Sequence, residues 1–128
     1  MRLHHVGVAV EDLDAAVELY QRVFGAELTH RASNEDLTAA FLRAGEAELE
    51  LLQPLRDDTP VGKFLAKRGP GIHHIAVAVP DIDRAMADAR EQGLEMIDEA
   101  PRIGLHGTRI AFIQPKSVGG VLTELVEA

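Results

Sequence analysis

The sequence predicts an α+β fold of two tandem βαβββ modules that pack as one domain, with a curved, mostly antiparallel sheet and the helices outside it. Two observations predict this fold. The stretch HHVGVAVEDLDAA, which begins at His4, recurs as HHIAVAVPDIDRA from His73. Each copy is followed by the same order of strand patterns, and such a repeat marks a duplicated unit. At 128 residues the chain is long enough to bury one ordinary core.

The first module covers about residues 1–54. Its alternating, β-branched stretch LHHVGVAV predicts a strand. Asp12 is a suitable N-cap for the helical stretch LDAAVELYQRVFG, whose apolar residues share one stripe and which stops at Gly25. Three further strands are predicted in AELTHR, LTAAFLRAG and AELELLQ. The alanines of LTAAFLRAG would also suit a helix.

The connector, about residues 55–71, is rich in proline, glycine and charge and predicts a short helix from Thr59 to about Lys67. The second module, about residues 72–128, repeats the first. IHHIAVAV predicts its first strand, Asp81 caps the helix IDRAMADAREQG, and LEMIDE, TRIAFIQP and GVLTELVE predict three more strands. Because each module alone would expose an apolar sheet face, we expect the two to pack together.

Composition excludes several classes of function. The formal net charge of −8 argues against nucleic-acid binding, which usually needs a clustered basic face. The chain has no cysteine, which excludes disulfides, thiolate metal ligands and thiol catalysis. No apolar leader follows Met1, and no apolar run is long enough to span a bilayer. We therefore expect a soluble, unprocessed, cytoplasmic protein without nucleic-acid or membrane partners.

Strand alternation separates the two members of each histidine pair. His5 shares a strand face with Gly7 and Ala9, and His74 stands at the equivalent place, at an offset of 69 (74 − 5), beside two alanines. The preceding histidine of each pair lies with the branched residues that face the helices. A single histidine of this kind is more often a core or surface residue. The duplicated small neighbours instead favour a ligand over the sheet.

Two carboxylates occupy matching places in the last strand of each copy. Glu50 and Glu124 are 74 residues apart (124 − 50), close to the offset of the histidines. Two imidazoles and two carboxylates form a plausible four-ligand set for a divalent first-row metal. The alternative is that Glu48, Glu50 and Glu124 all face solvent, and without the repeat that alternative would be favoured.

These residues resemble the vicinal oxygen chelate superfamily, which includes glyoxalases, and more closely the methylmalonyl-CoA epimerase family. The resemblance rests on HHVGVAVEDLDAAVELY, on ELLQPLRDDTPVGKFLAKRGPGIHHIAVAV and on EAPRIGLHGTRIAFIQPKSVGGVLTELVE. It implies one divalent metal ion, foremost cobalt, with nickel, manganese and zinc as alternatives. The implied metal ligands are His5, Glu50, His74 and Glu124. A homodimer is expected from the resemblance alone.

The resemblance also implies an activity, the interconversion of the R and S epimers of methylmalonyl-CoA by removal of the α-proton. Glu124 and Glu50 are then the expected catalytic bases. Some relatives carry a glutamate base at the position of Ala39, which cannot transfer a proton. Lys116 and Ser117, in PKSVGG, are expected near the acyl end of the CoA substrate. The further candidate cations for the CoA phosphates are Lys63, Lys67, Arg68 and Arg102.

Two other readings stay open. The same metal set would suit a glyoxalase-type enzyme acting on a hemithioacetal, and the same fold also serves non-catalytic proteins that bind small molecules. The motifs around the connector and PKSVGG favour the epimerase over the first, and four matched ligands favour an enzyme over the second. His30 and His106 break the repeat symmetry, so we expect them to be surface residues.

Overall fold

The computed structural model describes residues 1–128 and divides the chain into two compact units. The module-1 unit comprises His5–His73, and the module-2 unit comprises Met1–His4 together with His74–Ala128. The boundary near His73 agrees with the predicted start of the second module, and the connector belongs to the first unit. That the two modules pack as one domain stays a prediction.

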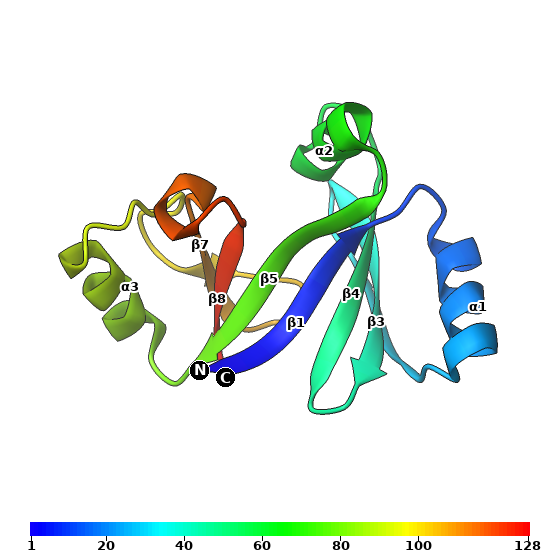
Figure 1. The fold of residues 1–128 in the computed structure, drawn as a ribbon, viewed down its shortest axis with the longest axis horizontal. Coiled ribbons are helices and arrows are strands. Elements are labelled where there is room, and N and C mark those ends of the chain that lie inside the picture. Colours follow the sequence, from blue (N-terminus) through cyan, green and yellow to red (C-terminus); the bar gives the residue numbers. More distant parts are fainter. The chain divides into compact units, whose positions relative to one another are not determined.

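The module-1 unit is built on four neighbouring strands in the order β2, β3, β4, β1. Their bounds are β1 (Arg2–Ala9), β2 (Leu28–Ser33), β3 (Leu37–Ala44) and β4 (Ala47–Pro54). From His5 onward β1 runs parallel to β4, whereas β2, β3 and β4 pair antiparallel. Figure 1 shows helix α1 (Leu13–Phe24) beside these strands. The uncertain stretch LTAAFLRAG is therefore a strand, β3.

Helix α1 begins and ends where the sequence predicts. Asp12 accepts a hydrogen bond from the Ala15 N–H at 3.1 Å, and Gly25 closes the helix with a left-handed φ of 64°. The buried residues Leu13 and Val17 pack on the outward face of the strands. Their partners in this cluster are Ala40, Leu42 and Leu51. The opposite face of β1 and β4 is thereby left for His5 and Glu50.

The connector forms helix α2 (Pro60–Arg68), as predicted. Thr59 caps it, because its buried hydroxyl accepts from the Gly62 N–H and donates to the Arg56 carbonyl. The guanidinium of Arg56 in turn bonds Asp36 and Asp58. Helix α2 is thus fixed to the turn between β2 and β3.

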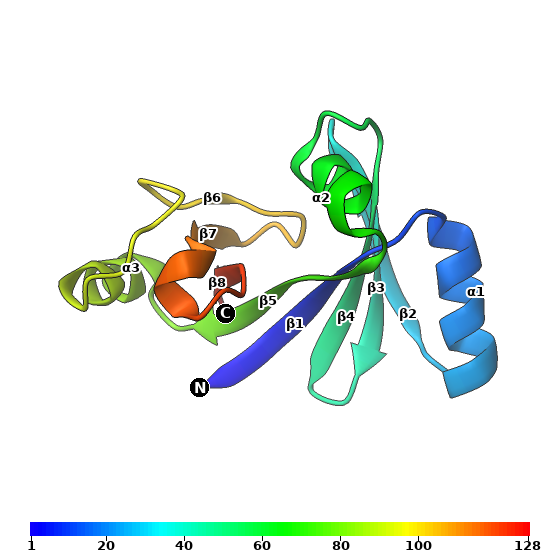
Figure 2. The ribbon, with the colours of Figure 1, turned by 45° about the horizontal axis from the view of Figure 1, so that its top comes forward.

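The module-2 unit repeats this arrangement with the strand order β5, β8, β7, β6 (Figure 2). The strands are β5 (Gly71–Val79), β6 (Arg102–Ile103), β7 (Arg109–Ile113) and β8 (Thr123–Glu127). Strand β5 is parallel to β8, and the other two pairings are antiparallel. A short 3-10 helix, η1 (Pro115–Val118), joins β7 to β8.

Helix α3 (Ile82–Glu91) covers the outward face of the module-2 strands. Asp81 caps it by accepting from the Arg84 N–H at 3.1 Å. Ile82 and Met86 are buried against the strands. Their partners are Ala111, Ile113 and Leu125. None of the three α-helices has the length and apolar character needed to cross a membrane.

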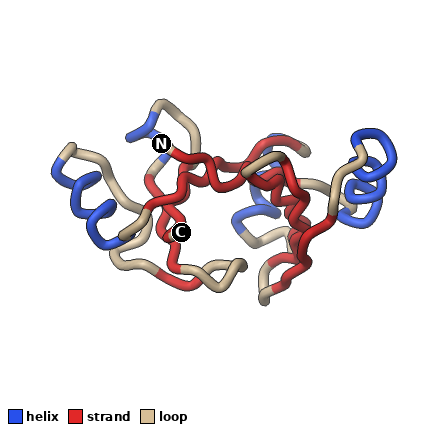
Figure 3. Tube along the Cα trace, turned by 90° about the horizontal axis from the view of Figure 1, so that it is seen from below, coloured by secondary structure: helices blue, strands red, loops and turns tan.

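The predicted strand LEMIDE, residues 94–99, is wrong. Only an isolated bridge between Met96 and Ile113 forms there, and most of the segment between α3 and β7 is loop (Figure 3). The side chain of Asp98 explains this: its carboxylate accepts from the Phe112 N–H at 2.8 Å, a donor that a strand carbonyl would otherwise use. The edge strand β6 starts later, at Arg102.

Candidate active site

The module-1 unit buries a histidine beside a carboxylate. His5 is 1% exposed and Glu50 is 5% exposed. The His5 Nε2 and Glu50 Oε1 atoms are 3.6 Å apart. Gly7, two residues after His5, stands directly opposite Glu50 in the parallel ladder. Because side chains alternate, His5 and Glu50 project from the same face, and the small residue opposite Glu50 leaves their side chains room to meet.

The module-2 unit repeats this geometry. His74 is 3% exposed and Glu124 is 5% exposed, with 3.2 Å between His74 Nε2 and Glu124 Oε1. Ala76, two residues after His74, stands opposite Glu124. The histidine and the glutamate therefore have the same register relationship in both modules.

The solvent-facing alternative is wrong for Glu50 and Glu124, since both are buried. Glu48 is half-buried rather than solvated, and it accepts a hydrogen bond from the Thr29 hydroxyl at 2.7 Å. Burying a carboxylate among apolar residues is costly unless a cation or hydrogen-bond donors compensate it. The two buried glutamates occupy equivalent positions in the two modules, which marks this face as the candidate site.

A phenylalanine accompanies each glutamate. Phe41 stands opposite Glu50 across the β3–β4 ladder, and Phe112 stands opposite Glu124 across the β7–β8 ladder. The His74 ring meets the Phe112 ring edge-on, with their centroids 5.6 Å apart. The sequence pattern did not single out these two aromatics. Their separation of 71 (112 − 41), close to the offsets of the histidines and glutamates, was the available signal.

The donor set of each pair fits metal coordination. Two nitrogen or oxygen donors that each lie about 2.1 Å from one ion are about 3.0 to 3.4 Å apart at octahedral or tetrahedral angles. The pair in module 2 falls within that range at 3.2 Å, and the pair in module 1 lies just outside it at 3.6 Å. Imidazole nitrogen and carboxylate oxygen are common ligands of divalent first-row ions. Each unit can therefore supply two ligands to one ion.

Three residues after each glutamate, a second polar side chain fixes the strand end to a helix. Gln53 Oε1 accepts from the Leu13 N–H at 2.7 Å, and Glu127 Oε2 accepts from the Ile82 N–H at 3.0 Å. Arg109 reinforces the second contact by bonding both Glu127 and Asp83. The hydrogen bonds from Arg109 to Asp83 raise the pKa of this guanidinium, so it stays charged at every working pH. These contacts hold the glutamate strands in register with their helices.

The predicted substrate-binding pair has internal partners. Lys116 Nζ lies 3.1 Å from Glu95 Oε2, and the Ser117 hydroxyl accepts from the Glu95 N–H at 3.0 Å. A role for either residue near the acyl group stays a prediction. Ala39 is fully buried in β3, opposite Leu52 of β4, so the position of a glutamate base in some relatives is apolar here.

The other histidines and cations fall outside the two pairs. His30 is exposed, as expected, but His106 is half-buried with its ring edge-on to His4 at 4.9 Å, which corrects the surface expectation. Lys63 and Lys67 are exposed on α2, and the guanidinium of Arg68 lies 5.8 Å from the Phe64 ring centre. Their roles toward phosphates stay predictions.

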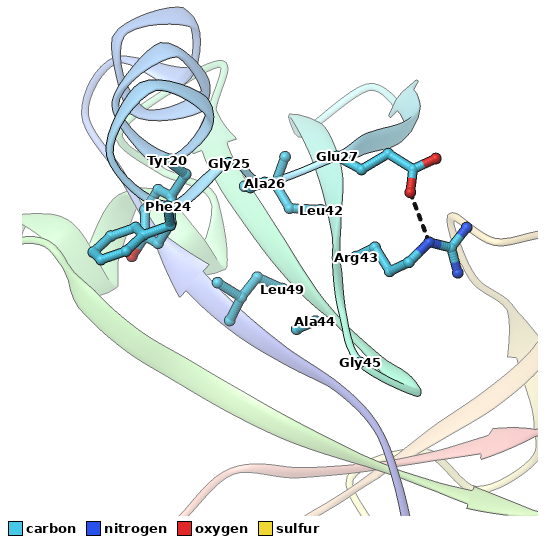
Figure 4. Close-up of a pocket in the computed structure, with 10 residues that line it drawn as sticks. All are labelled: Tyr20, Phe24, Gly25, Ala26, Glu27, Leu42, Arg43, Ala44, Gly45 and Leu49. Carbon is cyan, nitrogen blue, oxygen red and sulfur yellow. Dashed lines mark hydrogen bonds and ion pairs between the residues drawn. The ribbon is translucent and has the colours of Figure 1, made fainter.

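A separate pocket of about 420 Å³ lies between the end of α1 and the β3–β4 hairpin (Figure 4). Tyr20, Leu42 and Leu49 line it, and an ion pair of 2.9 Å joins Glu27 to Arg43 at its border. Leu42 and Leu49 belong to the helix-facing cluster. The pocket is therefore on the face opposite the buried histidine and glutamate.

Comparison with known proteins identifies the family. Residues 4–112 match the model of the Glyoxalase/Bleomycin resistance protein/Dioxygenase superfamily. The Bacillus subtilis (strain 168) protein YqjC is 40% identical over 98% of this chain and 91% of its own length. The mitochondrial methylmalonyl-CoA epimerase of Homo sapiens is 36% identical over 99% of this chain and 74% of its own length.

A solved structure agrees with these relatives. A methylmalonyl-CoA epimerase in complex with methylmalonyl-CoA and NH4+ has a TM-score of 0.94 and 44% sequence identity, over 98% of this chain and 92% of that chain. The α+β class and the duplicated βαβββ order predicted from the sequence are those of the glyoxalase-type fold. The chain belongs to the Glyoxalase/Bleomycin resistance protein/Dioxygenase superfamily and, within it, to the methylmalonyl-CoA epimerase family.

Proposed function

We propose that this protein is a metal-dependent epimerase that interconverts (R)- and (S)-methylmalonyl-CoA. The observation that carries the proposal is the duplicated, buried pair of histidine and glutamate, His5 with Glu50 and His74 with Glu124. Epimerisation at a carbon between a thioester and a carboxylate needs proton transfer on two faces of a planar enolate. A fold with two equivalent carboxylates, one in each module, suits that demand.

The four residues together form the proposed metal centre. Two imidazoles and two carboxyl groups are donors that a divalent first-row ion accepts. A bound divalent ion supplies Lewis-acid stabilisation to the oxygen that gains charge when the α-proton leaves. The donor set accepts cobalt, nickel, manganese and zinc, with cobalt proposed first from the family resemblance.

The protein's own groups perform the proton transfers. One glutamate, as the carboxylate, takes the α-proton from one face, and the glutamate of the other module, as the carboxylic acid, delivers its proton to the opposite face; exchange with solvent then resets both groups. Each carboxylate has two oxygens, so one oxygen can stay a ligand while the second acts as acid or base. Assigning Glu124 and Glu50 to these two roles leaves no need for a glutamate at Ala39.

The small residues beside each histidine serve substrate access. The strand residues beside each histidine have small side chains, which leaves space over the sheet for a thioester to approach the carboxylates. These residues are Gly7 and Ala9 in β1, and Ala76 and Ala78 in β5. A branched side chain at Gly7 or Ala76 would fill the space between a histidine and its glutamate partner. The CoA thioester is the proposed partner of this face, since a related epimerase of known structure holds methylmalonyl-CoA.

A stereospecific coupled assay tests the proposal. Purified protein of known metal content is given one epimer of methylmalonyl-CoA, and a mutase that accepts only the other epimer reports its formation. The proposal expects turnover that stops on chelation and returns when metal is added. A glutathione hemithioacetal serves as the competing substrate. Turnover of the hemithioacetal with no epimerisation would replace the epimerase with a glyoxalase-type activity, and inactivity on both would favour a binding protein.

A further inference from the structure

Arg102 is a cation on the same sheet face as the buried pair of the module-2 unit. It stands opposite Ile110 across the β6–β7 ladder, and Ile110 lies two residues before Phe112, the partner of Glu124. Residues two apart on a strand and residues directly opposite one another share a face. Arg102 therefore projects on the face of Glu124 and His74, and the strands β5 to β8 of this unit place no other lysine or arginine there.

Asp98 holds the guanidinium of Arg102, while the two terminal nitrogens of that guanidinium remain available to a ligand. Its Nε donates to Asp98 Oδ1 at 2.9 Å, and the other oxygen of Asp98 accepts from the Phe112 N–H at 2.8 Å. Its central carbon lies 5.5 Å from the centre of the Phe112 ring, which contacts His74. No residue of the protein bonds the two terminal nitrogens, and the side chain is about half exposed. A guanidinium with free terminal nitrogens is suited to a carboxylate.

The distance from strand β6 to strand β8 would let Arg102 reach a ligand bound over the sheet face that carries His74 and Glu124. Strand β6 is separated from β8 by one intervening strand, which amounts to about 10 Å between backbones. The Arg102 side chain covers part of that span by lying over the Phe112 ring toward Glu124. A small anion beside the carboxylate of Glu124 would then meet a positive charge on the β6 side.

The module-1 unit has no cation at the equivalent position, and its strand arginine on this face, Arg43, is paired with Glu27 at 2.9 Å. Its equivalent of Ile110 is Ala39, two residues before Phe41, and the residue opposite Ala39 in the β2–β3 ladder is Ala32. Arg102 in one module thus corresponds to Ala32 in the other. The two modules agree in histidine, glutamate and phenylalanine but differ at this position. The α-carbon of the substrate is also asymmetric, because it carries a thioester on one side and a carboxylate on the other. A cation in only one module could therefore distinguish these two substituents.

We propose that Arg102 binds the free carboxylate of the acyl-CoA substrate and so determines which end of the acyl group faces the module-2 unit. The inference rests on the proposed epimerase function and adds to it a specificity-determining residue. Nearly equivalent modules would otherwise accept the acyl group in two orientations, and only one of these presents the α-proton correctly. Asp98 acts as a positioning residue, since its carboxylate holds the Arg102 guanidinium.

The experiment compares a charged substrate with its uncharged isostere. Arg102→Gln, Arg102→Lys and a control, Arg84→Gln, are made, because Arg84 is an exposed arginine on α3 whose ion pair with Asp88 is loose at 3.9 Å. Each variant is characterised by its metal content, its melting temperature, its kcat and KM for methylmalonyl-CoA, and the inhibition constant of isobutyryl-CoA. Isobutyryl-CoA carries a methyl group where the substrate has its carboxylate.

Arg102→Gln is expected to lower kcat/KM for methylmalonyl-CoA by about 10- to 100-fold, the effect of losing a hydrogen-bonded charged partner. The inhibition constant of isobutyryl-CoA should stay within about twofold of wild type, and Arg102→Lys should recover part of the loss. Arg84→Gln should change neither constant. An equal loss for isobutyryl-CoA, or no loss for methylmalonyl-CoA, would overturn the inference.

A truncated substrate separates the carboxylate from the CoA phosphates. Methylmalonyl-pantetheine keeps the carboxylate and lacks the nucleotide phosphates, so the Arg102→Gln penalty should persist with it. If the penalty disappeared with the truncated thioester, Arg102 would bind a phosphate and the inference would be wrong. Wild-type turnover is read separately: an active wild type with an unaffected Arg102→Gln overturns only this inference, whereas an inactive wild type overturns the proposed function and the inference together.

Discussion

The Nε2 atom of His74 lies 3.2 Å from the Oε1 atom of Glu124, and both side chains are buried on a sheet face lined by small residues. His5 and Glu50 repeat the arrangement in the other module with the same register. The two pairs together form the proposed ligand set, so changing one member should alter metal binding or proton transfer in a defined way.

Replacing His74 by alanine should abolish metal binding at stoichiometric concentration. Loss of an outer-shell partner already costs about 10- to 100-fold in metal affinity, and removal of a direct ligand should cost at least the upper value. The matched control is His73→Ala, because His73 is adjacent in sequence but lies on the opposite face, against Phe64. Metal titration of both variants checks this. Equal affinities in the two would contradict the assignment of His74 as a ligand.

Glu124→Gln and Glu50→Gln should have opposite stereochemical effects. Each variant keeps an oxygen donor for the metal but cannot act as a base, so kcat for epimerisation should fall by about 10²- to 10⁴-fold. Each should still exchange the α-proton of one epimer with solvent, without inversion, and the two variants should differ in which epimer exchanges. Proton exchange is measured by NMR for each pure epimer. Loss of exchange with the same epimer in both variants would contradict the two-base arrangement.

Metal should stabilise the folded protein. A ligand that binds only the native state stabilises it by about 2.7 kcal/mol at a concentration of 100 times its dissociation constant. Thermal unfolding with increasing metal concentration, compared with chelated protein, should show a rising melting temperature. The His74→Ala variant is the control and should show little rise. A melting temperature independent of metal in the wild type would contradict the proposed centre.

Gly62→Ala should destabilise the protein although it lies in a helix. Alanine in a helix interior is normally about 1 kcal/mol more favourable than glycine. A Cβ at Gly62 would meet the Arg56 carbonyl and the backbone of Asp57, so the Thr59 cap and the end of the connector would have to move. Chemical denaturation measures the change, with the exposed Ala66→Gly on the same helix as the reference for propensity alone. A stabilised Gly62→Ala would show that the close backbone approach is absent.

Most of the fold and site predictions made from the sequence depended on its internal repeat. Asp12 and Asp81 cap their helices, as predicted. The matched offsets of Glu50 and Glu124 predicted metal ligands; both side chains are buried, and their role as ligands stays a prediction. The helix caps and the shared face of each histidine and glutamate could be predicted because local hydrogen bonding and strand alternation depend on residues close together in the sequence.

The region before β7 was not predictable in the same way. LEMIDE has the apolar pattern of a strand, yet the Asp98 side chain takes the Phe112 N–H, and the edge strand begins only at Arg102. With the strand misplaced, Arg102 fell in a loop and no sheet face could be assigned to it. A side chain that replaces a backbone partner leaves no periodic signal in the sequence.

The central claim is removal of an α-proton by this protein, and the most direct measurement is proton exchange in deuterated water. The metal-loaded protein is given one epimer of methylmalonyl-CoA, and NMR follows loss of the α-proton signal while a stereospecific assay follows inversion. The account predicts exchange with inversion in the wild type, loss of both on chelation, and recovery when metal is restored. Absence of α-proton exchange in protein that contains stoichiometric metal would contradict it.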